Sequence, residues 1–410
     1  MKIDGHKAGE LDSTFGDSGA AYFSDAYYLF GMTTDSNESI YVAGVTRDDK
    51  FYLARATRDG KLDTNFGGIG YVIGTFLDDH KSQASTVSID QQDRVLITGR
   101  VYGSGDKIGV ARFTPDGNLD ETFADKGRAA IPPPSESFTT EPPQTARESS
   151  QSSAAMVLSD GTIMVFQKLG LAPYLVRLTE NGKLDQTFNG TGYVKVFYED
   201  YDLLPSSKSV IEGERLIIGA TIFTHPLNYG LLAGYNLNGQ LDRTFAEDGY
   251  ALLREPADLG SEIWNLQQAQ GDKIWAIGRT TPPGIGSGLP PSRGLLTRLS
   301  KDGHIDVTFN QGQPVLTPPG FDDEWIAGVL QNDGKVVLAG SQFAAPAGGK
   351  LGRYHPDGRP DKGFGENGIR FLPSKGSARL VTLQKDGRIL IGGAVSPEGY
   401  SVAAILRYHN

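Results

Sequence analysis

The sequence has no cysteine, which excludes disulfide frameworks, thiolate nucleophiles and cysteine-ligated metal centres. Basic residues are outnumbered, 39 Lys and Arg against 49 Asp and Glu. The net charge of −10 does not favour nucleic acid or an anionic membrane as partner. No run approaches 18 apolar residues and residues 1–11 have no apolar core, so neither a membrane span nor a signal peptide is visible. The compartment stays open: cytoplasmic, or exported without a cleaved leader.

Motifs for catalysis are also missing. The sequence contains no HExxH, P-loop or GxSxG pattern, and the Gly-rich segment 284–288 has no strand and helix around it to cradle a phosphate. Of the six histidines, only His80 and His225 fall outside the termini and the repeated turns. This inventory leaves the enzyme question open and leans towards a protein without catalysis.

Glycine, by contrast, is abundant, and much of it belongs to one repeated motif, D/N-G-x-L-D-x-T-F-x-x-x-G. The seven copies lie at 8–19, 59–70, 116–127, 181–192, 238–249, 302–312 and 357–368. Their spacing of 51 to 65 residues is typical of a propeller blade with variable loops.

Each interval between motifs carries three short β-type runs, and a fourth follows the last glycine of the motif. We name these strands A to D in chain order; in the second unit the first three are 84–90, 94–99 and 109–114. The chain begins with a motif and the D strand at 20–23, and it ends after an A–B–C set. Joining these two parts completes seven blades and leaves no open sheet edge.

The sequence therefore predicts an all-β fold, a single seven-bladed β-propeller over residues 1–410. Each blade has four antiparallel strands, and the N-terminal strand closes the ring by joining the C-terminal blade.

Three recurring residue types are interpreted as structural rather than as metal or sugar ligands. The motif aspartates are Asp12, Asp63, Asp120, Asp185, Asp242, Asp306 and Asp361. C strands carry a candidate partner at Arg55, Arg112, Arg177, Arg298, Arg353 and Arg407. A bidentate bridge would tie each turn to its strand, and the fourth unit is predicted to lack it because Gly234 replaces the arginine. The motif phenylalanines are predicted to anchor neighbouring blades. Core positions are expected for Trp264, Trp275 and Trp325.

The Leu-Asp-x-Thr-Phe-Gly motif, with Arg-aromatic and Asp-Gly pairs upstream, resembles the bacterial delta-60 repeat family over nearly the whole chain. The third, sixth and seventh copies depart from the pattern at Ala124, Gln311, Pro360 and Gly363. The resemblance implies a β-propeller; it implies no activity and no catalytic residues.

Variable connections point to one face of the propeller as the binding face. The A–B turns and C–D motifs are uniform, whereas the B–C and D–A segments vary and include Pro/Ser-rich insertions at 132–150 and 280–293. Such loops either carry binding residues or are merely tolerated.

The D–A segments hold 15 acidic and six basic residues, and three clusters precede A strands near the expected channel mouth. These candidate binding residues are Asp78, Asp79 and His80; Glu199, Asp200 and Asp202; and Asp322, Asp323 and Glu324. They would hold a hard cation such as Ca²⁺ or attract a basic partner, unless they are only a solvated loop surface.

Two functions remain in competition. The first is a non-catalytic binding propeller that recognises a protein or carbohydrate ligand through the variable-loop face and its acidic channel mouth. The alternative is a cation (Ca²⁺)-dependent hydrolase or lactonase-like enzyme that uses the same carboxylates. We expect a monomer, with calcium as the one cofactor to consider.

Overall fold

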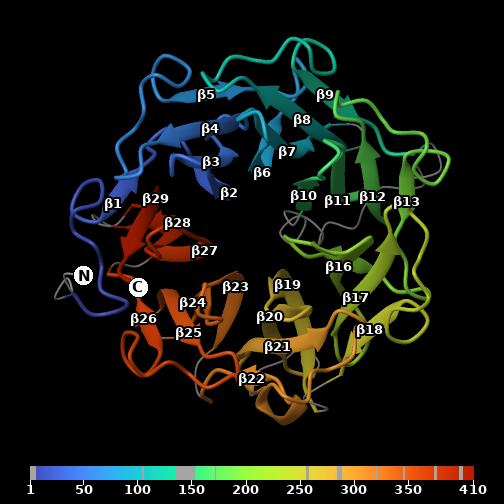
Figure 1. The fold of residues 1–410 in the computed structure, drawn as a ribbon, viewed down its shortest axis with the longest axis vertical. Coiled ribbons are helices and arrows are strands. Elements are labelled where there is room, and N and C mark those ends of the chain that lie inside the picture. Colours follow the sequence, from blue (N-terminus) through green and yellow to red (C-terminus); the bar gives the residue numbers. More distant parts are fainter. Residues whose placement is uncertain are drawn as a thin grey trace.

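The computed structural model describes residues 6–103, 106–134, 153–170, 172–254, 258–283, 289–319, 322–344, 347–373, 376–396 and 400–410. The chain forms seven antiparallel sheets arranged as a ring around a central channel (Figure 1). This confirms the predicted all-β, seven-bladed propeller.

The blades are numbered here from the first complete A–B–C set. Blade 1 contains β2 (Tyr28–Thr34), β3 (Ile40–Val45), β4 (Phe51–Ala56) and β5 (Tyr71–Gly74). Blade 2 contains β6 (Ser82–Ile89), β7 (Val95–Val101), β8 (Lys107–Phe113) and β9 (Arg128–Ile131). Blade 3 contains β10 (Ser153–Val157), β11 (Ile163–Leu169), β12 (Ala172–Leu178) and β13 (Tyr193–Lys195). Blade 4 contains β14 (Leu203–Pro205), β15 (Val210–Glu212), β16 (Arg215–Ile222), β17 (Tyr229–Asn236) and β18 (Tyr250–Leu253).

The remaining blades follow the same order from the channel outwards. Blade 5 contains β19 (Gly260–Ala269), β20 (Lys273–Thr281), β21 (Gly294–Ser300), the 3₁₀ turn η3 (Asn310–Gly312) and β22 (Val315–Leu316). Blade 6 contains β23 (Asp323–Leu330), β24 (Val336–Gln342), β25 (Gly348–Tyr354) and β26 (Ile369–Phe371). Blade 7 contains β27 (Gly376–Leu383), β28 (Ile389–Val395), β29 (Val402–Tyr408) and β1 (Ala20–Tyr22).

Blade 7 is built from both ends of the chain. Strand β1 pairs antiparallel with β29, with Ala20 opposite Leu406 and Tyr22 opposite Ala404. The two ends of the chain accordingly lie close together on the ring (Figure 1). This pairing gives the last blade its fourth strand and covers an edge that would otherwise expose unpaired backbone groups.

The motif phenylalanines lock neighbouring blades together, as the sequence predicts. All seven are at most 1% exposed: Phe15, Phe66, Phe123, Phe188, Phe245, Phe309 and Phe364. Six rings lie under the Asp-Gly or Asn-Gly turn of the next blade, and Phe364 lies under the Ala8-Gly9 turn; a β-carbon on Gly182, for example, would come within 2.4 Å of the Phe123 ring. The glycine of that turn is therefore required for close approach as well as for its positive φ of 74°.

The arginine–aspartate pairing is also confirmed, but each arginine meets its aspartate through one N–H···O bond rather than the predicted bidentate bridge. In the six predicted pairs the arginine Nε lies 2.7–2.9 Å from the aspartate Oδ2: Arg55–Asp63, Arg112–Asp120, Arg177–Asp185, Arg298–Asp306, Arg353–Asp361 and Arg407–Asp12. The guanidinium also reaches the next blade. Arg112 Nη1 donates to the Glu180 carbonyl at 2.6 Å, and its guanidinium carbon lies 4.6 Å from the Phe123 ring centre. One side chain thus joins a strand, a turn and the neighbouring blade.

The prediction that the fourth unit lacks a bridge is wrong. Arg215, on β16 rather than on the C strand β17, places its Nε 2.6 Å from Asp242 Oδ2. Its Nη1 donates to the Lys301 carbonyl of blade 5 at 3.0 Å. Gly234 leaves the necessary space, because a β-carbon there would lie 3.3 Å from Arg215 Cδ. The bridge is therefore kept with its donor moved to the adjacent strand.

Trp275 and Trp325 are buried in the core, whereas Trp264 is only partly buried. Most of the 132–150 insertion and part of the 280–293 insertion lie outside the described residues. In the part of the chain that is described, no helix is long and apolar enough to cross a membrane.

Candidate functional site

The innermost strands share a local irregularity at the channel. In five blades the A strand contains a β-bulge, one extra residue opposite the B strand. The extra residues are Phe30, Ser85, Trp264, Ile326 and Arg379. A bulge re-aims the side chain that it carries and is frequent beside binding sites. All five fall in the first half of their strands, so they lie nearer the D–A ends.

Glycines on the B strands make these bulges possible. The facing residues are Gly44, Gly99, Gly278, Gly340 and Gly393. A β-carbon on any of them would fall within 1.8–2.0 Å of a backbone carbonyl oxygen of the A strand. No larger residue fits without displacing that carbonyl, so the glycines determine where the bulges form. In blade 3, Gln167 occupies the corresponding place on β11 and pairs regularly with Ser153.

In blade 4 the inner strand is interrupted instead. β14 ends with Pro205 opposite Ala220, and β15 begins with Val210 opposite Ile217. Four residues of the inner strand, 206–209, therefore face only two of β16. This excursion brings Ser207 and Lys208 to the wall of the channel.

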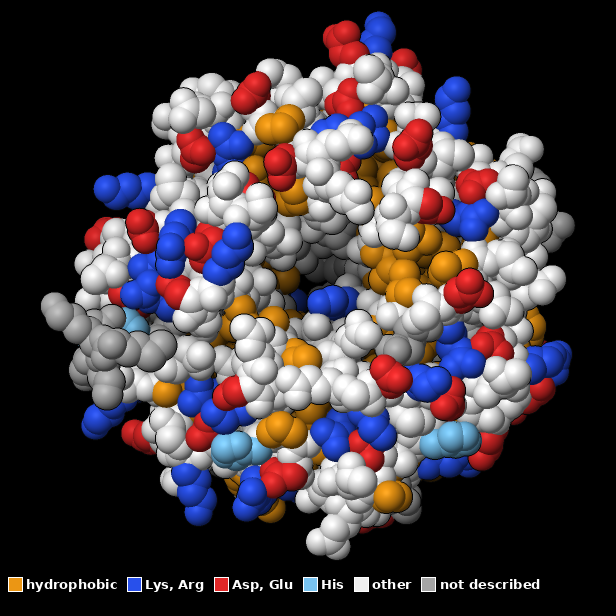
Figure 2. Space-filling model, viewed as in Figure 1, with side chains coloured by type: hydrophobic (Ala, Val, Ile, Leu, Met, Phe, Trp, Pro, Cys, Tyr) orange, Lys and Arg blue, Asp and Glu red, His pale blue; other side chains and the backbone are white. Residues whose placement is uncertain are grey.

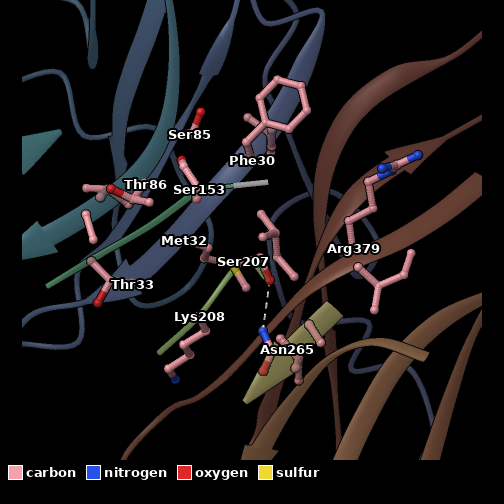
Figure 3. A pocket seen from close by; sticks show the side chains of 18 of the residues that line it. Phe30, Met32, Thr33, Ser85, Thr86, Ser153, Ser207, Lys208, Asn265 and Arg379 are labelled. Atoms are coloured by element: carbon pink, nitrogen blue, oxygen red, sulfur yellow. Dashed lines mark hydrogen bonds between the residues drawn. The ribbon is translucent and has the colours of Figure 1, made fainter. Parts of the chain in front are cut away.

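The channel encloses a cavity of about 350 Å³, within the usual range of about 300–1,000 Å³ for small-molecule sites. Its lining includes four of the five bulge residues, Phe30, Ser85, Ile326 and Arg379, together with Ser153 and the blade 4 excursion. Figure 3 shows Phe30, Ser85, Ser153 and Arg379 around the cavity, carried by strands of different blades. The wall offers hydroxyl, amide and cationic groups beside apolar ones.

A chain of hydrogen bonds fixes the polar wall between blades 4 and 5. Ser207 Oγ donates to the Trp264 carbonyl at 2.8 Å and accepts from Asn265 Nδ2 at 3.1 Å (Figure 3). Gln267 Nε2 donates to Asn265 Oδ1 at 3.0 Å, and Lys208 Nζ donates to Gln267 Oε1 at 2.9 Å. Asn265 and Gln267 are both buried. The network holds its members in place and leaves two ammonium protons of Lys208 for a ligand.

Two cations face this cavity. Lys208 is exposed to the channel, and desolvation by the surrounding protein lowers its pKa to about 8. Its ammonium form prevails at pH 7. Arg379 is exposed and makes no hydrogen bond or ion pair with any described residue. Figure 2 shows Lys or Arg side chains in the central hollow, whereas the acidic side chains on that face lie further out.

The nine acidic-cluster residues lie elsewhere: the described residues that line the cavity include none of them. Asp78, Asp79 and the segment Glu199–Asp202 are exposed, and Asp78 pairs with Arg128 at 3.0 Å. His80 Nδ1 lies 2.8 Å from the Asp78 carbonyl oxygen. The first two clusters precede β6 and β14, whereas Asp323 and Glu324 of the third already belong to β23, so the clusters lie in three different blades.

The third cluster is largely occupied by protein partners. Asp323 is buried; its Oδ1 accepts from Thr317 Oγ1 at 2.6 Å and from the Gly294 amide at 2.7 Å, and its Oδ2 pairs with Lys350. Glu324 lies 3.5 Å from Arg279, and burial raises the pKa of Glu324 despite that neighbour. Asp322 Oδ1 accepts from the Ser292 amide.

Among the residues that the structure describes, no three His, Asp or Glu side chains gather as a group able to hold a metal ion. Calcium binding by the predicted residues stays a prediction, which a calcium titration of the melting temperature tests.

Sequence reasoning missed the bulge residues and Lys208. A signal was available in the strand patterns, since a glycine recurs at one position of the B strands and is replaced by Gln167 in the third unit. The interruption of the inner strand in blade 4 could not be predicted in this way, because β14 and β15 are each only three residues long and their sequence is typical of a loop.

Comparisons with known proteins agree with the architecture. A family model described as "Domain of unknown function (DUF5122) beta-propeller" matches residues 91–123 and 331–364. No curated protein matches the chain in sequence.

Among solved structures, the chain resembles a polysaccharide lyase of family PL25, an ulvan lyase bound to -[GlcA(1-4)Rha3S]-, at 11% identity and a TM-score of 0.53, covering 95% of this chain and 94% of that one. A protein of unknown function from Dyadobacter fermentans aligns at 11% identity and a TM-score of 0.48, covering 95% and 99%. At these identities the likeness shows the fold alone.

Proposed function

We propose that this chain is a non-catalytic binding propeller that recognises a protein or glycan partner through its variable-loop face, with a polar group of that partner held in the central channel. The observation that carries the proposal is the ring of bulges. In five blades the A strand has a β-bulge at the same position opposite the B strand. Four of the five bulge residues line one cavity.

The side chains at this level are suited to holding a ligand. Ser85, Ser153 and Asn265 contribute hydroxyl and amide groups, and Lys208 and Arg379 contribute positive charge. Rigid strands carry most of them, which favours a preformed site. Among the carboxylates that a hydrolase would draw on, Asp78 pairs with Arg128 and Asp323 with Lys350. Asp79, Glu199, Asp200 and Asp202 are exposed and do not line the cavity.

A channel-blocking variant tests the proposal. Thr33 lines the cavity from β2, so Thr33→Trp should fill it; Thr64→Trp adds the same bulk at an exposed position of a motif turn. Thermal shift with a panel of neutral, acidic and basic oligosaccharides and peptides should identify a ligand that stabilises the wild-type protein. At a hundredfold excess over Kd the stabilisation is about 2.7 kcal/mol.

We expect that ligand to stabilise Thr64→Trp equally and Thr33→Trp hardly at all. Equal stabilisation of both variants would place the ligand outside the channel and contradict the proposal. Cleavage of the ligand during incubation, detected by chromatography and lost in Thr33→Trp, would replace binding with catalysis at the same site.

A further inference from the structure

Two cationic side chains line the channel, and no acidic side chain among the described residues lines it with them. Lys208 from blade 4 and Arg379 from blade 7 line the same cavity, and Figure 3 shows them on different sides of it. No Asp or Glu occurs among the described residues of that lining. Glu324 is near enough for the charge of Arg379 to influence it, but its carboxylate lies against Arg279. Two such cations within low-dielectric walls attract an anion.

A buried hydroxyl in the same wall also lacks a partner. Ser153 is 5% exposed, and its Oγ has no hydrogen-bond partner among the described residues. Buried polar groups in native proteins are nearly always hydrogen-bonded, and exceptions call for an explanation. The oxygen itself has almost no accessible surface, however, so this hydroxyl is no evidence for a ligand in the cavity.

Aromatic rings continue the site at its blade 1 side. Phe30 lines the cavity, and its ring centre lies 6.1 Å from that of Tyr28. Tyr28 packs in turn at 4.2 Å on Tyr27, and both tyrosines are exposed. Arg47 lies over the Tyr27 ring at 4.8 Å, so Tyr28 and Phe30 are the rings on which the C–H face of a sugar could pack.

We propose that the channel binds an acidic oligosaccharide, with separate sugar carboxylates paired with Lys208 and with Arg379 and a neighbouring hydroxyl bonded to the Ser207–Asn265 pair. This rests on the proposed function and names its ligand class. Charge-assisted hydrogen bonds to a carboxylate are about twice as strong as neutral ones, so the two cations select for acidic sugars. Salt screens the repulsion between an acidic sugar and surface carboxylates that lie further away than the Debye length, which is about 8 Å at physiological salt.

Calorimetric titration with trigalacturonate, and with galactotriose as the uncharged probe, tests the inference. The wild-type protein should bind trigalacturonate at least tenfold more tightly than galactotriose. Arg379→Gln and Lys208→Gln should each weaken trigalacturonate binding at least tenfold, while Arg379→Lys keeps most of it. Arg359→Gln and Lys61→Gln remove equal charge at exposed repeated turns and should leave Kd unchanged. Circular dichroism and the melting temperature establish that each variant is folded.

Three results would overturn the inference: equal binding of both sugars, no binding of trigalacturonate, or unchanged affinity in the two site variants. Binding of poly-glutamate in place of trigalacturonate would retain the anion and reject the saccharide. If trigalacturonate fails while another probe binds and is blocked by Thr33→Trp, this inference is wrong and the proposed function stands. If trigalacturonate binds Thr33→Trp as it binds wild type, both are wrong.

Discussion

At the scale of single residues, the bridge between arginine and aspartate is the most repeated interaction of the molecule, and Arg215–Asp242 tests it most stringently. Both side chains are partly buried, 16% and 12% exposed. A double-mutant cycle with Arg215→Ala and Asp242→Ala, measured by urea unfolding, should give a coupling of about 1–3 kcal/mol. The exposed pair Arg243–Asp248 serves as control and should couple by less than about 1 kcal/mol. If both pairs give the same small coupling energy, the Arg215–Asp242 bridge stabilises the fold no more than an exposed ion pair does.

The same aspartates predict how stability responds to pH. Burial alone would raise the pKa of Asp120, but hydrogen bonds from Thr122 and Arg112 outweigh it and lower the pKa. Asp12, Asp185, Asp242, Asp306 and Asp361 are likewise lowered. A carboxylate with a lowered folded-state pKa stabilises the fold above its unfolded-state pKa of about 3.9 and loses that contribution as pH falls through the folded-state value.

Denaturant unfolding between pH 7 and pH 3 should therefore show constant bridge stabilisation down to about pH 5 and a steep loss below about pH 4. Asp120→Asn should lower stability at pH 7 and reduce that acid loss. Asp116→Asn, an exposed position in the adjacent turn, should do neither. An acid loss of the same size in Asp120→Asn would mean that other groups cause it.

Residue roles were predictable from the sequence only where they repeat. The C-strand arginine and its aspartate recur in six units and the phenylalanine anchor in all seven, so a period reveals them. Arg215 was missed because it compensates for Gly234 from another strand, although an aspartate kept without its arginine is a signal for a second donor. Lys208 and Arg379 occur once each, and their meaning depends on which blades face each other across the channel.

At the scale of elements, the bulges connect strand geometry with the site. A β-carbon on Gly393 would lie 2.0 Å from the Ser377 carbonyl oxygen, so Gly393→Ala must displace the bulge that presents Arg379. We expect a loss of about 1–3 kcal/mol in urea unfolding and weaker trigalacturonate binding. Gly363→Ala, where the nearest atom is the Asp361 carboxylate oxygen at 3.3 Å, should change neither by much. If a folded Gly393→Ala protein binds trigalacturonate as tightly as the wild type, the bulge is not needed to position Arg379 for binding.

At the scale of the whole molecule, the ring depends on β1 completing blade 7. Deleting residues 1–23 removes β1 and the Asp12 and Phe15 contacts with Arg407. It should lower the melting temperature sharply and promote association through the exposed edge of β29, visible in size-exclusion chromatography. Deleting residues 1–5 alone should leave both unchanged. A truncated protein that melts like the full chain and stays monomeric would show that the ring does not need this strand.

The proposed binding site depends on the whole ring, because the propeller brings seven inner strands together at one axis. Sequence reasoning located function at acidic loops near that axis, whereas the geometry favours the wall of the channel, whose described lining residues carry positive charge. The most direct test is an experimental structure of the protein with trigalacturonate. The account predicts density for the sugar in the channel, with one carboxylate in contact with Lys208 and another in contact with Arg379. Sugar bound only at the outer loops, with the channel holding nothing but solvent, would contradict it.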